Sequence, residues 1–332
     1  MALSVGIDFD ENNWKICMLE HGEVLELRSF VSSSAALAYV ERYCVLYPEL
    51  TIVAATAGFE SPFTPLHNLG IPPSVEMHAE SEAEQQAFGA KALLIAIGNM
   101  NLNSYNAPSV KYLPTVSLHR KLMRPHLGAS NSLCATAALL YGLRKREAVW
   151  PEMRFLCVKV DQDTKSILVV EDGRIVNGIS DTPGGMGALM NGVPGYVNES
   201  FPNEEDGREF KAQELEHRGE AKNVVHASEQ AFWEGLTHEL AGLMAIHHLE
   251  DVVVTGENKA ALIERFADSY QVYLFPYSEL DVEGYESALG AAVLAEGLYS
   301  PGLTSEVVER LQVREASVGV VSTAPGILRI IS

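Results

Sequence analysis

The feature that most constrains this chain is a set of three short apolar segments that occurs twice. The first copy covers residues 3–9, 14–19 and 24–30, and the second covers residues 154–160, 166–170 and 174–179. Short apolar runs between polar turns predict β-strands, so each copy predicts a three-stranded meander. Asp8 in the first copy aligns with Asp161 in the second. We interpret the two halves as duplicated domains rather than as a solenoid.

Helices and further strands follow each meander. In the first half, Ser32 to Ser34 offer N-caps for a helix that ends at Pro48, and a buried strand follows over residues 51–56. In the second half, a polar stretch at residues 198–223 predicts a surface excursion. After it the sequence predicts a helix over 227–249, a strand over 251–255, a helix over 258–267, a strand over 272–275 and a small-residue helix over 285–298. This alternation predicts a sheet that is at least partly parallel.

The length of 332 residues is about twice what one core usually fills, which favours two domains. We expect a first domain over residues 1–150, a second over 151–311 and a tail over 312–332. Hydrophobic residues make up 47% of the chain and charged residues 20%, a composition that excludes a mainly disordered chain.

The net charge is −20, which repels nucleic acids and anionic lipid surfaces and so argues against both as partners. The first residues lack the basic start and apolar run of a secretory signal. The four cysteines lie far apart, without C-x-x-C spacing. We therefore expect a cytoplasmic protein with reduced cysteines. The sequence does not determine the oligomeric state, and a homodimer is among the states that it allows.

Two meanders that each turn just after an Asp, and a later strand that ends in Thr255-Gly256, resemble the superfamily of acetate and sugar kinases, heat-shock chaperone ATPases and actin. The resemblance implies an α/β, two-lobed actin-like (ribonuclease H-like) ATPase fold. In that fold, duplicated β-β-β-α-β-α domains enclose an inter-lobe cleft that binds ATP. The segment 287–292 matches the small-residue helix that such proteins use for close packing at the lobe interface.

The same resemblance implies roles for individual residues. The first phosphate loop of the superfamily reads D-x-G-T-T-x-x-K, and here Asp8 and Lys15 keep that spacing. The second loop reads D-x-G-x-T, and residues 161–164 resemble it, with Asp161 as the acid and Thr164 as a candidate phosphate donor. An acid in each loop would hold Mg²⁺, while Lys15 and Thr164 would contact phosphate. The adenosine motif places nucleotide contacts at Thr255, Gly256, Glu257 and Asn258.

A more specific similarity begins at residue 113 with L-P-T-V-S-L-H-R-K and continues through H-L-G-A-S-N at 126–131. It extends to a glycine-rich loop at 181–187, where we expect Gly185 to contact the nucleotide, and to the P-G-Y turn at 194–196. These segments resemble an uncharacterised, mostly archaeal family of predicted butyrate kinases, and the resemblance covers roughly residues 3–300. It implies phosphoryl transfer from ATP to a small carboxylate such as butyrate or acetate. Arg120 is the expected catalytic cation.

Several positions depart from these patterns. Asp10, Asp163 and Glu257 stand where the superfamily motifs have glycine, and 128–132 lacks the Thr, Asp and Lys of the family's G-T-A-D-K segment. The sequence therefore keeps a second hypothesis open, a nucleotide-binding or regulatory relative without turnover. Structural interpretations also remain open for Lys15, on an exposed strand face, and for Arg120, in a structural ion pair. An actin-like filament former is a third and weaker hypothesis.

Overall fold

The computed structural model describes most of the chain as two compact units. The described residues are 3–10, 13–56, 61–69, 92–100, 102–124, 126–161, 165–180, 221–276, 282–317, 322–324 and 327–329, with backbone alone at 10, 56, 221–229, 322–324 and 327–329. Unit 1 comprises Met1–Arg154, Val170–Asn177 and Phe275–Ser332, and unit 2 comprises Phe155–Val169 and Gly178–Leu274. The domain boundaries expected at residues 150 and 311 stay predictions.

Unit 1 contains a six-stranded sheet. Its strands are β1 (Ser4–Asp10), β2 (Asn13–Glu20), β3 (Glu23–Phe30), β4 (Thr51–Thr56), β5 (Thr64–Pro65) and β6 (Asn103–Asn106), in the order β3-β2-β1-β4-β6-β5. The meander β1-β2-β3 is antiparallel, and β4 lies parallel to β1 and to β6. The predicted meander and the strand predicted at 51–56 are therefore confirmed.

Strand β1 is buried on both faces. Its odd-numbered residues point to one face and its even-numbered residues to the other. Leu3, Val5 and Ile7 join the apolar core formed with helix α1 (Ser33–Leu46) and a helix over residues 92–98. Helix α1 begins as predicted, because the Ser32 hydroxyl accepts a hydrogen bond of 3.2 Å from the backbone N–H of Ala35.

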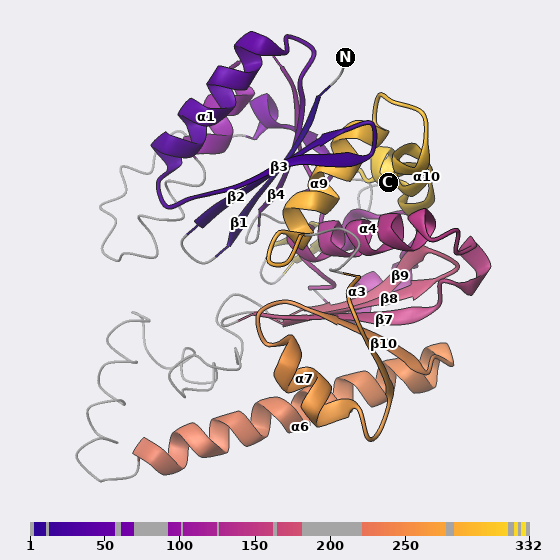
Figure 1. The fold of residues 1–332 in the computed structure, drawn as a ribbon. Helices are drawn as coiled ribbons and strands as arrows, with labels where there is room; N and C mark the ends of the chain where they lie inside the picture. The colour runs from indigo at the N-terminus through magenta and orange to yellow at the C-terminus, as the bar shows by residue number, and fades with distance from the viewer. Residues whose placement is uncertain are drawn as a thin grey trace. The chain divides into compact units, whose positions relative to one another are not determined.

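The opposite face of β1 packs against helix α9 (Glu286–Gly297), whose residues are all buried (Figure 1). A Cβ at Gly6 would lie 1.9 Å from the backbone oxygen of Ala288. A Cβ at Gly290 would lie 1.7 Å from the backbone oxygen of Cys134 in helix α4 (Ser130–Lys145). Glycine is required at both positions because any side chain would overlap backbone atoms. This close packing of the small-residue helix lies within unit 1, where helix α10 (Leu303–Leu311) also contacts α9, and its expected place at the lobe interface stays a prediction.

The second sheet has five strands: β7 (Phe155–Val160), β8 (Lys165–Glu171), β9 (Arg174–Ser180), β10 (Asp251–Thr255) and β11 (Gln271–Leu274). Their order is β11-β10-β7-β8-β9, and β10 is parallel to β7 and to β11. Five of the six strands of the first sheet follow the same plan, in the order β6-β4-β1-β2-β3. The predicted duplication and the partly parallel sheet are confirmed.

Helices α6 (Ala221–His247) and α7 (Lys259–Phe266) belong to unit 2 and lie side by side (Figure 1). The apolar side chains Phe232, Leu236 and Leu240 recur every four residues along α6 and are buried. Helix α6 begins six residues before the predicted start at 227; Ala221, Val224 and Val225 already have the helical spacing i, i+3, i+4, a signal that the prediction did not use. Most of the predicted excursion at 198–223 lies outside the described residues.

The turns between the second and third strands of the two repeats have the same backbone conformation. His21 and Gly22 have φ of 53° and 78°, and Asp172 and Gly173 have φ of 51° and 71°. Two successive positive φ angles define the tight hairpin turn whose twist matches that of the strands. The repeat therefore extends to its turns. Within the described residues, no helix is long and apolar enough to cross a bilayer.

Short elements complete the described residues of unit 1. They are η1 (Leu66–Asn68), η2 (Val110–Tyr112), α3 (Leu118–Met123), η3 (Trp150–Glu152), η5 (Val313–Glu315), β12 (Ser322–Ala324) and β13 (Ile327–Arg329). Strands β12 and β13 form a two-stranded antiparallel hairpin in the predicted tail.

Candidate functional site

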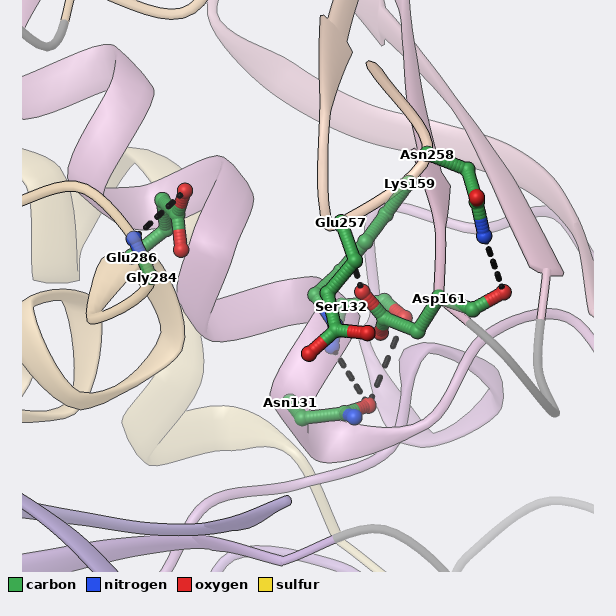
Figure 2. Close-up of polar contacts among 8 residues, drawn as sticks. All are labelled: Asn131, Ser132, Lys159, Asp161, Glu257, Asn258, Gly284 and Glu286. Atoms are coloured by element: carbon green, nitrogen blue, oxygen red, sulfur yellow. Dashed lines mark hydrogen bonds and ion pairs between the residues drawn. The ribbon is translucent and has the colours of Figure 1, made fainter. Parts of the chain in front are cut away.

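The predicted second phosphate loop and the predicted adenosine motif meet in unit 2. Asp161 follows β7 directly, and the turn 256–258 follows the neighbouring parallel strand β10. The backbone N–H of Glu257 donates to Asp161 Oδ1 over 3.4 Å, and Asn258 Nδ2 donates to the Asp161 backbone oxygen over 3.0 Å (Figure 2). The carboxyl ends of parallel strands bring these residues together, as in other α/β folds that bind ligands at such ends.

Gly256 makes this close approach possible. Its φ is +92°, and a Cβ there would lie 2.6 Å from the Val160 backbone oxygen and 2.8 Å from Asp161 Oδ1. A side chain at this position would be strained and would overlap the neighbouring strand. The Glu257 side chain is exposed, while its backbone N–H faces Asp161. The substitution of Glu for glycine at 257 is therefore compatible with this turn.

Lys159 also binds Asp161, and the sequence analysis missed it. Lys159 Nζ forms a buried ion pair with Asp161 Oδ2 (Figure 2). The two residues lie two positions apart at the end of β7, so their side chains share one face of the strand. A lysine within the apolar run F-L-C-V-K-V-D was a usable signal, because a buried ammonium group requires a counter-charge.

Asp8 occupies the aligned position in unit 1, near the end of β1, and is buried. It shares a strand face with Gly6, toward α9. Burial raises the pKa of the Cys134 thiol in α4 well above its usual range, and the negative charge of Asp8 raises it further. The carboxylate of Asp8 therefore lies within electrostatic reach of the first turns of α4.

Lys15 is the direct cross-strand partner of Asp8 in the antiparallel pair β1–β2. Directly opposed residues of such a pair project their side chains from the same face. The predicted D-x₆-K spacing thus corresponds to two facing positions of one hairpin. Lys15 is half-buried, which corrects the structural interpretation of an exposed strand face.

Arg120 lies in the short helix α3 (Leu118–Met123), and its Nη1 donates to the backbone oxygen of Val176 in β9 over 2.8 Å. The Thr115 hydroxyl of the same motif donates to the Ile175 backbone oxygen over 2.6 Å. Strand β9 is an edge strand of its sheet, so some of its backbone groups have no partner strand. Side chains of the motif that starts at residue 113 donate hydrogen bonds to two of its backbone oxygens. Burial lowers the pKa of Lys121, whose Nζ donates to the Leu113 backbone oxygen over 2.8 Å.

Other predicted residues lie elsewhere. Thr164 and Gly185 fall outside the described residues, as do Asp163 and the loop 181–187. Thr255 is buried at the end of β10. The segment at 126–131 leads into α4, as the resemblance implies, and Asn131 Oδ1 accepts from the Ser132 N–H over 2.8 Å (Figure 2). At the start of α9, Glu286 Oε1 accepts from the Gly284 N–H over 3.3 Å.

The donor atoms at both acids fit a magnesium ion. Mg²⁺ prefers carboxylate oxygens and usually takes only one or two from the protein, with water and phosphate oxygens completing the shell. Among the described residues, no group of three or more His, Cys, Asp or Glu side chains could hold a metal ion. A single carboxylate, such as that of Asp8 in unit 1 or that of Asp161 in unit 2, is compatible with a magnesium ion whose other ligands are phosphate and water.

The strand order and the repeated acids define the class of this protein. A meander followed by a parallel strand, with an acid at the end of the first strand, occurs in both sheets. This duplicated arrangement is the actin-like, ribonuclease H-like ATPase fold that the sequence predicts.

A family model described as "Protein of unknown function (DUF1464)" matches residues 6–323, and the chain belongs to that family. The butyrate kinase activity expected from the sequence is not part of that description. None of the curated proteins matches the chain.

Solved structures of low identity resemble the chain over most of its length. The inorganic polyphosphate/ATP-glucomannokinase of Arthrobacter sp. strain KM is 13% identical, with 90% of this chain and 100% of the enzyme covered and a TM-score of 0.42. The activator of the 2-hydroxyisocaproyl-CoA dehydratase of Clostridium difficile, solved with ADPNP, is 12% identical, with 92% and 96% covered and a TM-score of 0.42. A glucokinase of Streptomyces griseus, solved with glucose and AMPPNP, is 14% identical, with 89% and 99% covered and a TM-score of 0.43.

Proposed function

We propose that this protein binds Mg–ATP and transfers its γ-phosphoryl group to a small carboxylate. The observation that carries the proposal is the connection between Asp161 and the turn 256–258. This connection joins the predicted second phosphate loop to the predicted adenosine motif through three hydrogen bonds: two to Asp161 and one, of 3.0 Å, from the Asn258 N–H to the Val160 backbone oxygen. These bonds fix the turn beside Asp161, and Gly256, which has no side chain, lets a nucleotide approach the backbone closely.

The proposal gives each residue a task. Thr255, Gly256, Glu257 and Asn258 contact the nucleoside through the turn, and Asp8 and Asp161 hold the magnesium ion of the same nucleotide. Lys15, Thr164 and Gly185 contact phosphate oxygens. Bound magnesium neutralises the charge on the β- and γ-phosphates.

In the proposed reaction, a carboxylate oxygen of the acceptor forms a bond to the γ-phosphorus while the bond to the β–γ bridging oxygen breaks. The products are an acyl phosphate and ADP. Arg120 stabilises the negative charge on the transferring group. A guanidinium has five N–H donors, and the bond to Val176 occupies one of them, so both tasks are compatible.

A second candidate is a nucleotide-binding member of the fold without turnover, and specific observations favour it. Lys159 already pairs with Asp161, and Arg120 already bonds the backbone of β9. Asp10 and Glu257 add negative side chains at positions where the superfamily motifs have glycine. Such a protein would report nucleotide levels to a partner rather than phosphorylate a metabolite.

Calorimetric titration with Mg–ATP tests nucleotide binding. We expect saturable binding by the wild type and at least about tenfold weaker binding by Asp8→Asn and Asp161→Asn, since one charge-assisted ligand contact contributes more than about 1.4 kcal/mol. Asp251→Asn is the matched control, because Asp251 lies at the opposite end of β10. Circular dichroism verifies that each variant is folded. No binding at millimolar Mg–ATP, or unchanged affinity in both acid variants, would contradict the proposal.

ADP release with acetate, propionate and butyrate separates the two candidates. A working kinase releases ADP only when an acceptor is present, whereas binding without ADP release supports the second candidate. We expect Arg120→Lys to lower kcat by about 10²–10³-fold, because the ammonium group cannot reproduce the guanidinium geometry. Arg124→Lys, at the exposed end of α3, is the control. Equal kcat for both variants would remove Arg120 from the proposed mechanism.

A further inference from the structure

The ion pair between Lys159 and Asp161 stands at the position where the proposed function requires a cation. Lys159 Nζ contacts Oδ2, and the Glu257 N–H donates to Oδ1 (Figure 2). Both carboxylate oxygens of Asp161 thus already face a positive or partly positive group. The Lys159 and Asp161 side chains are 8% and 7% exposed, so water screens this attraction poorly.

The first repeat has nothing equivalent along the strand. Gly6 stands two residues before Asp8, as Lys159 stands two residues before Asp161. The backbone of α9 fills the space above Gly6 and excludes any side chain there. An intrastrand ammonium group next to the acid is therefore a property of the second repeat alone.

We propose that Lys159 is a positioning residue that competes with a divalent cation for Asp161. Without the cation, its ammonium group neutralises the buried carboxylate and keeps it directed at the turn 256–258. A divalent cation binds Asp161 only by displacing Lys159 from Oδ2. This inference uses the proposed assignment of Asp161 as a cation ligand and adds the residue that controls its occupancy.

The alternative is a purely structural ion pair, and the two interpretations differ in a measurable way. If Lys159 only stabilises the fold, its removal lowers stability and leaves cation affinity unchanged. If Lys159 competes for the carboxylate, its removal exposes Asp161 to cations. A neutral residue at 159 then raises the affinity for a divalent cation, and this gain requires Asp161.

The test is a titration of the full-length chain with Mn²⁺, without nucleotide, followed by electron paramagnetic resonance of the free ion. We expect Lys159→Met to gain one Mn²⁺ site that binds at least about tenfold more tightly than the wild type does, because one competing charge is gone. The double variant Lys159→Met/Asp161→Asn should lose that site.

Lys165→Met is the matched control. Lys165 lies on the neighbouring strand β8 and is also buried. Its Nζ pairs with Oε2 of Glu239, in helix α6, over 3.1 Å. Any Mn²⁺ gain of this variant would arise at Glu239, so it should be insensitive to Asp161→Asn, unlike the gain of Lys159→Met. If Lys159→Met does not fold, Lys159→Gln, whose amide can still donate to Asp161, replaces it. Wild-type affinity in the folded Lys159 variant, or a gain that persists with Asp161→Asn, would overturn the proposal.

These titrations contain no nucleotide, so their outcome is separate from that of the proposed function. Absence of Mg–ATP binding together with an Mn²⁺ gain in Lys159→Met would reject the proposed function and support the competition. Mg–ATP binding without any Mn²⁺ gain in Lys159→Met would support the proposed function and reject the competition.

Discussion

The two repeats share a strand order and differ in what lies beside their acids. Asp8 and Asp161 occupy the same topological position, but the residue two places earlier is Gly6 in one repeat and Lys159 in the other. In the first repeat a helix backbone packs against the strand at that position. In the second repeat a charged side chain fills it. Duplication therefore preserved the chain path while the surroundings of the two acids diverged.

Each repeat nevertheless associates a lysine with its acid. Lys15 reaches the position opposite Asp8 from the next strand of the hairpin, whereas Lys159 lies on the same strand as Asp161. Directly opposed positions on two paired strands share a face of the sheet, as do alternate positions along one strand. Each acid thus has a lysine on the same face of its sheet, but the two lysines come from non-equivalent positions of the repeat.

The largest effect should come from filling the space above Gly6. We expect Gly6→Val to lower the free energy of unfolding by about 3 kcal/mol or more, because its side chain would overlap the backbone of Ala288 and Ala292, which cannot move aside. Urea denaturation measures this loss. Gly235→Ala in α6 is the control, because nothing lies within 4 Å of a Cβ there. A wild-type urea midpoint for Gly6→Val would show that α9 does not seal this face.

Next in size should be the loss of either partner of the buried ion pair. We expect Lys159→Met and Asp161→Asn each to cost about 3 kcal/mol, since each leaves one buried charge without its partner. The double variant should cost less than the sum. A double-mutant cycle in urea measures this coupling.

The exposed pair of Lys145 with Glu23 in the first repeat gives the contrast. Its side chains are 31% and 72% exposed, so Lys145→Met should cost at most about 1 kcal/mol. Equal losses for Lys145→Met and Lys159→Met would mean that burial does not distinguish the two ion pairs.

The equivalent turns should respond unequally to the same substitution. A Cβ at Gly173 would lie 2.3 Å from the Trp150 ring, whereas a Cβ at Gly22 would lie 2.6 Å from the Tyr141 hydroxyl. Both variants to Ala carry the strain of a positive φ, about 1 kcal/mol. We expect about 2 kcal/mol for Gly173→Ala, whose Cβ would overlap several atoms of the indole ring, and about 1.5 kcal/mol for Gly22→Ala, whose Cβ would displace only the Tyr141 hydroxyl from its hydrogen bond with the Gly22 backbone oxygen. Thermal unfolding ranks them, and the reverse order would contradict this account.

The smallest effect should be a pH dependence confined to the first repeat. The hydroxyls of Tyr39 and Tyr43 donate to Glu26 Oε2 over 2.7 and 2.8 Å and hold the pKa of that carboxyl below its usual value. The ionised Glu26 carboxylate therefore adds to the free energy of unfolding above its unfolded pKa of about 4.3. This addition is lost as the pH falls through the lower pKa of the folded state.

Stability measured from pH 6 to pH 3 should consequently decline less steeply in Glu26→Gln than in the wild type. The difference should be a few tenths of a kcal/mol, because solvent screens the partly exposed carboxyl. The aligned position of the second repeat is Asn177, which has no carboxyl, so Asn177→Ala should leave the slope unchanged. Parallel pH profiles for the wild type and Glu26→Gln would show that the tyrosine contacts with Glu26 do not cause the pH dependence of stability.

Much of the fold could be predicted because its signals are local. Apolar runs and polar turns predicted both meanders, and Ser32 marked the start of α1. The early start of α6 escaped prediction because its first three residues were assigned to the polar stretch 198–223, although Ala221, Val224 and Val225 have helical spacing. Within the candidate site, Asp161, Gly256, Glu257 and Asn258 were predicted from motifs and lie together in the structure.

Other parts of the site depend on contacts between distant segments. Arg120 was predicted as a catalytic cation, but its bond to Val176 crosses 56 positions of sequence and has no local signature. Lys159 was visible as a lysine in an apolar strand, yet only the packed structure shows which acid neutralises it.

The sequence by itself determined the order of strands and helices and the duplication, because apolar periodicity and turn residues act over a few neighbouring positions. The tertiary structure decided that α9 seals Gly6, that Lys159 pairs with Asp161 and that Arg120 anchors to β9. These outcomes depend on steep, short-range repulsion and on charge pairing in a low-dielectric interior. Both take effect only after folding has brought the partners within a few ångströms.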